Sequence, residues 1–271
     1  MTRLADFQTQ LNFRGLVDGS KYRYLRIAEL YMKRNGQSWT RESVMDFISS
    51  LNGGHNYKRW GFDVLRQFFD AIDEPWPFKR GEGPKLGKVS QPYLTQDQAE
   101  TLLELTKANP MHHAMFRVAC LTMARRAELA LINIEDFNPP EIRIRTKKAG
   151  DERVVLLDAT TIAAVVDYQD NVDFDTTTDG PLLSVTGRRL SPDQIGSIFR
   201  GYRRQMGLPE GLGLHAIRRG VATWLYKQGM RERELQEWGG WKTATMPHKY
   251  IQLVPGEVAK EALKIHPLAG G

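Results

Sequence analysis

The stretch between Pro75 and Gln91 differs from the rest of the chain because it is rich in proline, glycine and lysine. Few of these residues can pack into a core, and such a composition is typical of a connection between two folded parts. A chain of 271 residues is long enough for two such parts. We therefore predict an N-terminal domain at 1–78, a basic linker at 79–91 and a C-terminal domain at 92–271.

The N-terminal region is predicted to consist of helices, because its apolar residues recur at the three- and four-residue spacing of a helix face. The apolar stripes are Tyr22, Leu25, Ala28, Tyr31 and Met32, then Val44, Phe47, Ile48 and Leu51 after a capping Thr40, then Trp60, Val64, Leu65, Phe68, Phe69 and Ile72. Lysines and arginines fall largely on the other side of the first helix. Such a face is either simply solvated or lies along a DNA backbone, and this region alone does not decide between the two.

The C-terminal region is predicted to be mostly helical with one small antiparallel sheet, so that the fold class is mainly α. Capping signals that begin helices stand at Thr95, Asp158 and Ser191. A further helix is predicted from Arg125 to Ile132. Isoleucines alternate with arginines at 142–145 and an apolar run follows at 154–157, which predicts a β-hairpin with Lys147 and Lys148 at its tip.

The overall charge favours a polyanionic partner. The formal net charge is +6 at pH 7, and each lysine or arginine set against a phosphate displaces a condensed counterion. Many basic proteins bind nothing in particular, so the charge acquires meaning only together with motifs. No histidine stands at metal-ligand spacing from another histidine, a cysteine or a carboxylate, and we predict no metal site.

The chain is expected to work inside the cell. Its single cysteine, Cys120, lies in an apolar helical stretch as buried filler and has no partner for a disulfide within the chain, which suits a reducing cytosol. The first residues lack the apolar core of a signal peptide, and no apolar run is long enough to cross a bilayer. We expect a cytoplasmic protein with no membrane partner, associated with the nucleoid if its source is bacterial or archaeal.

Six residues suited to phosphate chemistry follow one another along the C-terminal region. They are Arg125, Lys147, His215, Arg218, Trp241 and Tyr250. Arg125 stands three residues before Glu128, and His215 stands three residues before Arg218, which places the second pair on one face of a predicted helix. Taken alone, a histidine and an arginine at this spacing would equally suit a structural role. The stronger indication of function is the order of all six residues along the chain.

This order resembles that of the tyrosine recombinase family, which includes the integrases and the Xer-type site-specific recombinases. The resemblance covers roughly residues 92–253. It implies that the six residues form one catalytic set, that 1–78 is a core-binding domain for DNA and that 92–271 is a catalytic domain. It also implies a site-specific recombinase that cleaves and rejoins DNA through a 3′-phosphotyrosyl intermediate, without metal, ATP or another cofactor, in integration, excision or resolution.

The resemblance further implies a double-stranded DNA recombination site as the partner. The two domains would close around the duplex as a C-shaped clamp, with two protomers on a site and four in the synapse. The basic residues expected to help hold the DNA are Lys79, Arg80, Lys85, Lys88 and Lys148.

Each residue type in the set has a physical use in attack on a phosphodiester. Arg125 and Arg218 are expected to hold the non-bridging oxygens, on which negative charge grows during in-line displacement. Tyr250 is the expected nucleophile, helped by nearby cations and a neutral imidazole at His215. The indole N–H of Trp241 can donate to a phosphate oxygen.

Two assignments stay open. Arg125 and Arg126 are adjacent, and only the spacing to Glu128 favours Arg125. A lysine ammonium is expected to protonate the leaving 5′-oxygen, and either Lys147 or Lys148 could be this general acid.

Other functions fit part of the pattern. A type IB topoisomerase-like relaxing enzyme shares the clamp and the nucleophile, but this chain is short and lacks a long helical insertion. A non-catalytic DNA-binding protein could keep the fold, but it would have no reason to keep all six residue types. For a third alternative, a helical module that binds RNA or protein, the sequence contains no distinguishing feature. The target DNA sequence does not follow from the sequence, because base readout depends on side-chain directions in the grooves.

Overall fold

The computed structural model describes residues 2–87, 92–146, 152–172 and 180–243. The chain forms two compact units, Met1–Ser90 and Gln91–Gly271, and each has its own hydrophobic core. Within the described ranges, no helix is both long enough and apolar enough to cross a membrane.

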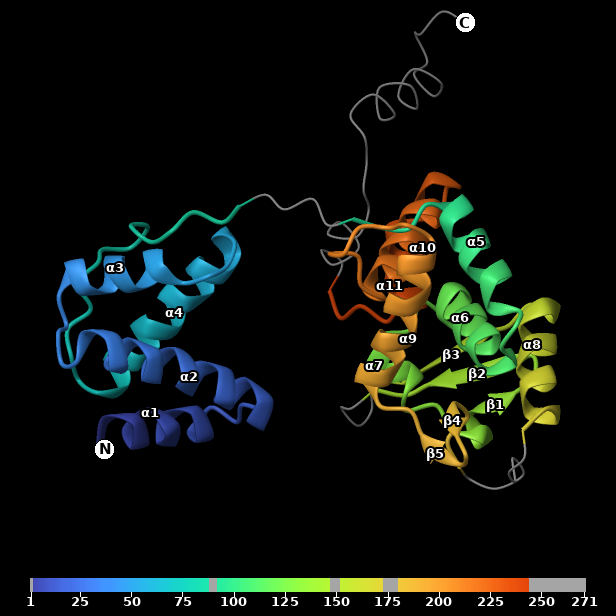
Figure 1. Ribbon diagram of the computed structural model, residues 1–271, viewed down its shortest axis with the longest axis horizontal. Coiled ribbons are helices and arrows are strands. Elements are labelled where there is room, and N and C mark those ends of the chain that lie inside the picture. The colour runs from blue at the N-terminus through green and yellow to red at the C-terminus, as the bar shows by residue number, and fades with distance from the viewer. Residues whose placement is uncertain (1, 88–91, 147–151, 173–179, 244–271) are drawn as a thin grey trace, which may run out of the picture. The chain divides into compact units, whose positions relative to one another are not determined.

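The first unit, as far as it is described, is a bundle of helices (Figure 1). They are α1 (Thr2–Phe13), α2 (Asp18–Asn35), α3 (Arg41–Ser50) and α4 (His55–Ala71). Aromatic side chains fill its core, where Tyr31, Phe68 and Phe69 are fully buried. Trp39 and Phe69 pack edge to face with their ring centroids 5.2 Å apart, an arrangement that aromatic pairs favour.

The predicted apolar stripes lie on α2, α3 and α4, and Thr40 caps α3 as predicted. The prediction was wrong at Tyr22, whose residue surface is 69% exposed. The buried side of α2 runs instead through Ile27, Ala28 and Tyr31, and Tyr22 lies outside that stripe. The apolar pattern did not single out α1.

Residues 79–87 of the predicted linker pack on the surface of the first unit. Glu82 forms an ion pair with Arg41 at an N–O distance of 2.8 Å. Arg59 donates a hydrogen bond to the carbonyl oxygen of Pro84 at 3.2 Å. These contacts give the polar segment a defined course even though few of its side chains are apolar.

The second unit, in its described part, combines helices with two small antiparallel sheets (Figure 1). The helices are α5 (Gln96–Thr106), α6 (Pro110–Thr122), α7 (Arg126–Leu129), α8 (Ala159–Asp170), α9 (Pro192–Gln205), α10 (His215–Lys227) and α11 (Glu232–Gly239), with a short 3-10 helix η1 (Ile134–Asp136). The strands are β1 (Phe137–Asn138), β2 (Glu141–Ile144) and β3 (Arg153–Leu156) in one sheet and β4 (Ser184–Val185) and β5 (Arg188–Arg189) in the other. The helix α6 contacts α5, α8 and α10 and lies among them. This mainly helical fold confirms the predicted fold class, and the sheet of β4 and β5 is an addition to the one small sheet that was predicted.

The strands β2 and β3 form the predicted hairpin. They pair antiparallel, with Ile142 opposite Val155 and Ile144 opposite Arg153. Both isoleucines and Val155 are buried, because alternate side chains of a strand point to the same face. The predicted tip with its two lysines lies outside the described residues.

The predicted capping signals are confirmed. Side-chain caps begin α5 at Thr95, α8 at Asp158 and α9 at Ser191. The helix predicted from Arg125 to Ile132 is shorter, since α7 ends at Leu129. It ends there because Ile132 leaves the helix and accepts a backbone hydrogen bond from Leu182 at 3.0 Å.

The helix α10 lies very close to the start of the second unit. A Cβ atom at Gly220 would stand 2.3 Å from the carbonyl oxygen of Leu94. The backbone N–H of Leu94 donates to the carbonyl of Ala216 at 3.2 Å, and Arg219 donates from Nε to the carbonyl of Pro92 at 2.9 Å. Only glycine leaves room for this approach.

Replacing Gly220 with alanine is expected to destabilise the second unit by roughly 1–3 kcal/mol, because the added methyl group forces the two backbones apart. The matched control is Gly201→Ala in α9, where a Cβ atom meets nothing within 4 Å. This control should be neutral or stabilise the unit by up to about 1 kcal/mol through helix propensity. Urea unfolding followed by circular dichroism gives both values, and a Gly220→Ala variant as stable as the wild type would contradict the close approach.

Candidate active site

Three segments of the second unit meet at the end of α6. Met123 caps this helix in the left-handed conformation, with φ 54° and ψ 26°, which is uncommon for a residue with a side chain. Its carbonyl oxygen accepts a hydrogen bond from Nη1 of Arg218 on α10, at 2.5 Å. The carbonyl of Gly239, at the end of α11, accepts from Nη2 of the same guanidinium. Arg218 therefore joins the end of α6 to the end of α11.

Arg125 follows this turn as the N-terminal cap of α7. Its backbone N–H donates to Oε2 of Glu128 at 2.9 Å, and its guanidinium forms an ion pair with the same carboxylate. Burial alone would raise the pKa of Glu128. The hydrogen bond from the backbone of Arg125 and the charges of Arg153 and Arg125 outweigh burial, so that the pKa lies below its ordinary value. Glu128 is thus a buried carboxylate that stays ionised.

The neighbouring Arg126 lines the same pocket as Arg125 but pairs with a different carboxylate. Its Nη1 donates to Oδ1 of Asp193 at 3.1 Å, and about half of its side chain is exposed. Of the two adjacent arginines, it is therefore Arg125 that Glu128 holds, as the three-residue spacing predicts.

Trp241 covers the buried Arg218. The guanidinium carbon lies 4.5 Å from the centroid of the indole ring, which is the geometry of a cation–π contact. The exposed fraction is 1% for Arg218 and 4% for Trp241. The indole ring therefore holds the guanidinium in addition to the two backbone carbonyls that accept from it.

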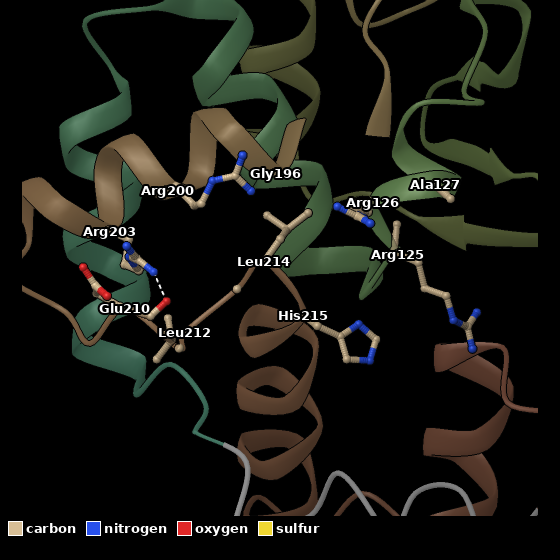
Figure 2. A pocket seen from close by; sticks show the side chains of 13 residues that line it. Arg125, Arg126, Ala127, Gly196, Arg200, Arg203, Glu210, Leu212, Leu214 and His215 are labelled. Carbon is tan, nitrogen blue, oxygen red and sulfur yellow. Dashed lines mark hydrogen bonds between the residues drawn. The ribbon is translucent and has the colours of Figure 1, made fainter. Parts of the chain in front are cut away.

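His215 begins α10 and lines a pocket of about 530 Å³ together with Arg125. Figure 2 shows these two side chains on one side of the view, with Arg200 and Arg203 on the other. Burial lowers the pKa of His215 to about 4, and the charges of Arg218, Arg219 and Arg125 act in the same direction. The imidazole is therefore neutral at pH 7 and can accept a proton or a hydrogen bond in a pocket lined by cations.

Comparison with known proteins decides the family of this chain. A sequence model described as the phage integrase family matches residues 92–256, which is more than half of the chain. The chain belongs to the phage integrase family. The match covers every element that meets at the end of α6 and confirms the predicted tyrosine recombinase family.

Relatives agree with this membership. The tyrosine recombinase XerD of Staphylococcus epidermidis is 28% identical over 243 residues, which cover 86% of this integrase-family chain and 79% of the relative. A lambda integrase dimer bound to a COC′ core site superposes with a TM-score of 0.74 at 17% identity, covering 93% of this chain and 76% of that one. The Tn1549 transposon integrase in complex with a circular intermediate DNA gives 0.75 at 18% identity, covering 97% and 99%. At these identities the two structures support the fold.

The structure of this integrase-family chain brings together four of the six predicted catalytic residues. Arg125, His215, Arg218 and Trp241 all lie around the end of α6 or line the pocket beside it. The other two, Lys147 and Tyr250, lie outside the described residues, as does the alternative general acid Lys148. The catalytic role of each residue stays a prediction.

Three of the five predicted DNA-binding residues lie on the polar segment of the first unit, and Lys148 lies outside the described residues. Lys79, Arg80 and Lys85 are exposed, and Lys88 lies outside the described residues.

Among the side chains that the structure describes, no three histidine, cysteine or carboxylate groups gather so that they could hold a metal ion. Cys120 as a whole residue is partly exposed. Burial of its thiol raises the pKa to about 12, which keeps the thiol protonated at neutral pH.

Sequence reasoning missed Arg153, which contacts the same cluster from β3. Its guanidinium approaches Glu128 and donates to backbone carbonyls. A signal was present, because the two-residue period of a strand places Arg153 on the same face as the buried Val155. A charged residue on the inward face of a strand requires a partner.

The lowered pKa of His215 makes stability depend on pH. Between pH 6.5 and about 4 the unfolded chain binds a proton at His215 that the folded chain does not, so this site lowers the free energy of unfolding as the pH falls through that window. His215→Gln removes the contribution. The free energy of unfolding, measured with urea from pH 7 to pH 4.5, should fall more steeply for the wild type than for the variant. Equal slopes would contradict a neutral, buried His215.

Proposed function

We propose that this integrase-family chain is a site-specific DNA recombinase that cleaves and rejoins DNA through a 3′-phosphotyrosyl bond to Tyr250. The observation that carries the proposal is that Arg125, although far in sequence from His215 and Arg218, lines one pocket with His215, while Arg218 is bonded to the end of α6 two residues before Arg125. Cations on two different elements near a neutral imidazole form a site for a phosphodiester. The family membership supports the same function.

In the proposed reaction, the phenol oxygen of Tyr250 attacks the scissile phosphorus. A new phosphorus–oxygen bond to tyrosine forms while the bond to the 5′-oxygen breaks. Arg125 and Arg218 bind the non-bridging oxygens as their negative charge grows. The phenol proton passes towards the neutral imidazole of His215, and an ammonium from Lys147 or Lys148 protonates the departing 5′-oxygen.

Rejoining is the reverse of this step. An incoming 5′-hydroxyl attacks the phosphotyrosyl phosphorus, the bond to Tyr250 breaks, and the phenol recovers its proton. The energy of the broken phosphodiester is conserved in the ester to tyrosine, so the proposed cycle consumes no ATP. Charge stabilisation comes from the guanidiniums, and the cycle as written uses no metal ion.

We assign the chain's regions accordingly. Residues 1–78 form the core-binding domain, 79–91 the basic linker and 92–271 the catalytic domain, with a double-stranded recombination site as the partner. Lambda integrase has been seen as a dimer bound to a core site and as a tetramer bound to a Holliday junction. We propose the same assembly for this chain, in the cytoplasm and, in a bacterial or archaeal cell, at the nucleoid.

The nucleophile is tested with a suicide substrate, a duplex that carries the recombination site with a nick near the cleavage position. In EDTA, the wild type should form a covalent protein–DNA complex that resists denaturing electrophoresis, and Tyr250→Phe should form none, because it lacks the attacking oxygen. A complex that persists in Tyr250→Phe, or one that requires a divalent metal, would be incompatible with the proposed reaction.

The two adjacent arginines provide a matched pair. Arg125→Ala should lower the rate of covalent complex formation by roughly 10²–10³-fold, because one fixed donor to the transition-state charge is lost. Arg126→Ala, which removes the exposed ion pair with Asp193, should lower it only a few-fold. Single-turnover kinetics on the same substrate measures both. A larger loss of rate in Arg126→Ala than in Arg125→Ala would mean that Arg126, and not Arg125, binds the phosphate.

A further inference from the structure

Arg153, the first residue of β3, is a cation that the proposed reaction does not use. Only 11% of its side-chain surface is exposed. Its Nε donates to the carbonyl of Trp238 at 3.0 Å, and its Nη2 donates to the carbonyl of Thr122 at 3.1 Å. Both Nη atoms lie 3.4 Å from Oε2 of Glu128. A buried guanidinium with this many directed contacts has a fixed position.

Arg153 and Arg218 bridge the same two stretches of backbone. The carbonyls that accept from Arg218 belong to Met123 and Gly239, and those that accept from Arg153 belong to the preceding residues, Thr122 and Trp238. The ends of α6 and α11 are therefore held together twice. The position of the two helix ends that Arg218 contacts therefore does not depend on Arg218 alone.

Glu128 is shared between Arg153 and Arg125. Arg125 binds Oε1 through its side chain and Oε2 through its backbone N–H, while Arg153 approaches Oε2. The exposed fraction of the side chain is 35% for Arg125, 4% for Glu128 and 11% for Arg153. Arg125 thus lies on the accessible side of the carboxylate and Arg153 on the buried side.

The formal charges of this trio add to +1. A pair of Arg125 and Glu128 alone would be neutral, and the carboxylate would cancel much of the attraction between Arg125 and a phosphate. A second guanidinium offsets the carboxylate, so that the trio keeps a positive charge beside the pocket. Arg153 supplies this charge from a position where it does not compete for the pocket.

The backbone next to the trio leaves space for Arg153. Gly240 has a φ of 61°, and a Cβ atom there would stand 2.9 Å from Nη1 of Arg153. A side chain at this position would therefore be strained and would meet the guanidinium. The turn between α11 and Trp241 is fitted to the presence of Arg153.

We propose that Arg153 is a positioning residue for Arg125: it holds Glu128 from the buried side, so that the carboxylate orients the Arg125 guanidinium at the pocket without cancelling its charge. The inference rests on the proposed function, in which Arg125 binds the scissile phosphate. Arg153 itself touches no substrate and acts only through Glu128 and Arg125.

The test is a double-mutant cycle on the rate of covalent complex formation with the suicide substrate. Arg153→Met removes both the charge and the contacts, whereas Arg153→Lys keeps the charge but has no planar fork to reach the carboxylate and two carbonyls together. The matched control is Arg189→Met, since Arg189 also donates to two backbone carbonyls, those of Ala130 and Ile132, without contacting the trio. Each variant is made in the wild-type and in the Arg125→Ala background, and circular dichroism sets a temperature at which all are folded.

In the wild-type background we expect Arg153→Met to lower the rate at least about 30-fold, Arg153→Lys about 3–10-fold and Arg189→Met less than about twofold. In the Arg125→Ala background, Arg153→Met and Arg153→Lys should each cost less than about threefold, because the residue through which Arg153 acts is already absent. If Arg153→Met does not fold, Arg153→Lys carries the same comparison.

Two results would overturn the inference while leaving the proposed function intact. One is an unchanged rate in both Arg153 variants. The other is an equal loss in the two backgrounds, which would make Arg153 a general structural residue. A wild type that forms no Tyr250-dependent complex would remove the proposed function, and the inference would fall with it.

Discussion

One buried carboxylate organises the cations of the second unit. Glu128 has lost almost all contact with water, and removing a carboxylate from water is costly unless charged partners and hydrogen-bond donors replace the solvent. Of its two partners, Arg125 caps the same helix α7, whereas Arg153 begins the strand β3. The requirement to keep Glu128 paired therefore joins the helical part of the unit to its sheet, and it holds the side chain of Arg125 at the pocket.

Much of the fold follows from local signals in the sequence. Thr95, Asp158 and Ser191 each cap a helix as predicted, because a side-chain oxygen and the first free N–H groups of a helix are neighbours along the chain. The strands β4 and β5 are not predicted, since two-residue strands contain too little alternation to reveal a period. The end of α7 is not predicted either. It depends on the pairing of Ile132 with Leu182, a residue fifty positions away.

The candidate site was predictable to the extent that its geometry is local. The spacing of Arg125 to Glu128 reports a real contact, because a capping residue and the third residue of a helix lie side by side. The burial of Arg218 beneath Trp241 was not predictable, because it joins α10 to the turn after α11 through a contact across space. The strand period of β3 indicates an inward-facing Arg153, but its partners come from α6, α7 and α11 and do not follow from the sequence. The predictions at Lys147 and Tyr250 lie outside the described residues and remain predictions.

The attachment of α10 to the first residues of the second unit has a mechanical consequence. Arg219 grips the carbonyl of Pro92 with two nitrogens, and Leu94 is hydrogen-bonded to Ala216, both within the first turns of the helix that also carries His215 and Arg218. Tension applied to the polypeptide just upstream of Pro92 would pass into this helix before it reached any other element. The first residues of the second unit and the helix α10, which carries His215, are therefore mechanically coupled.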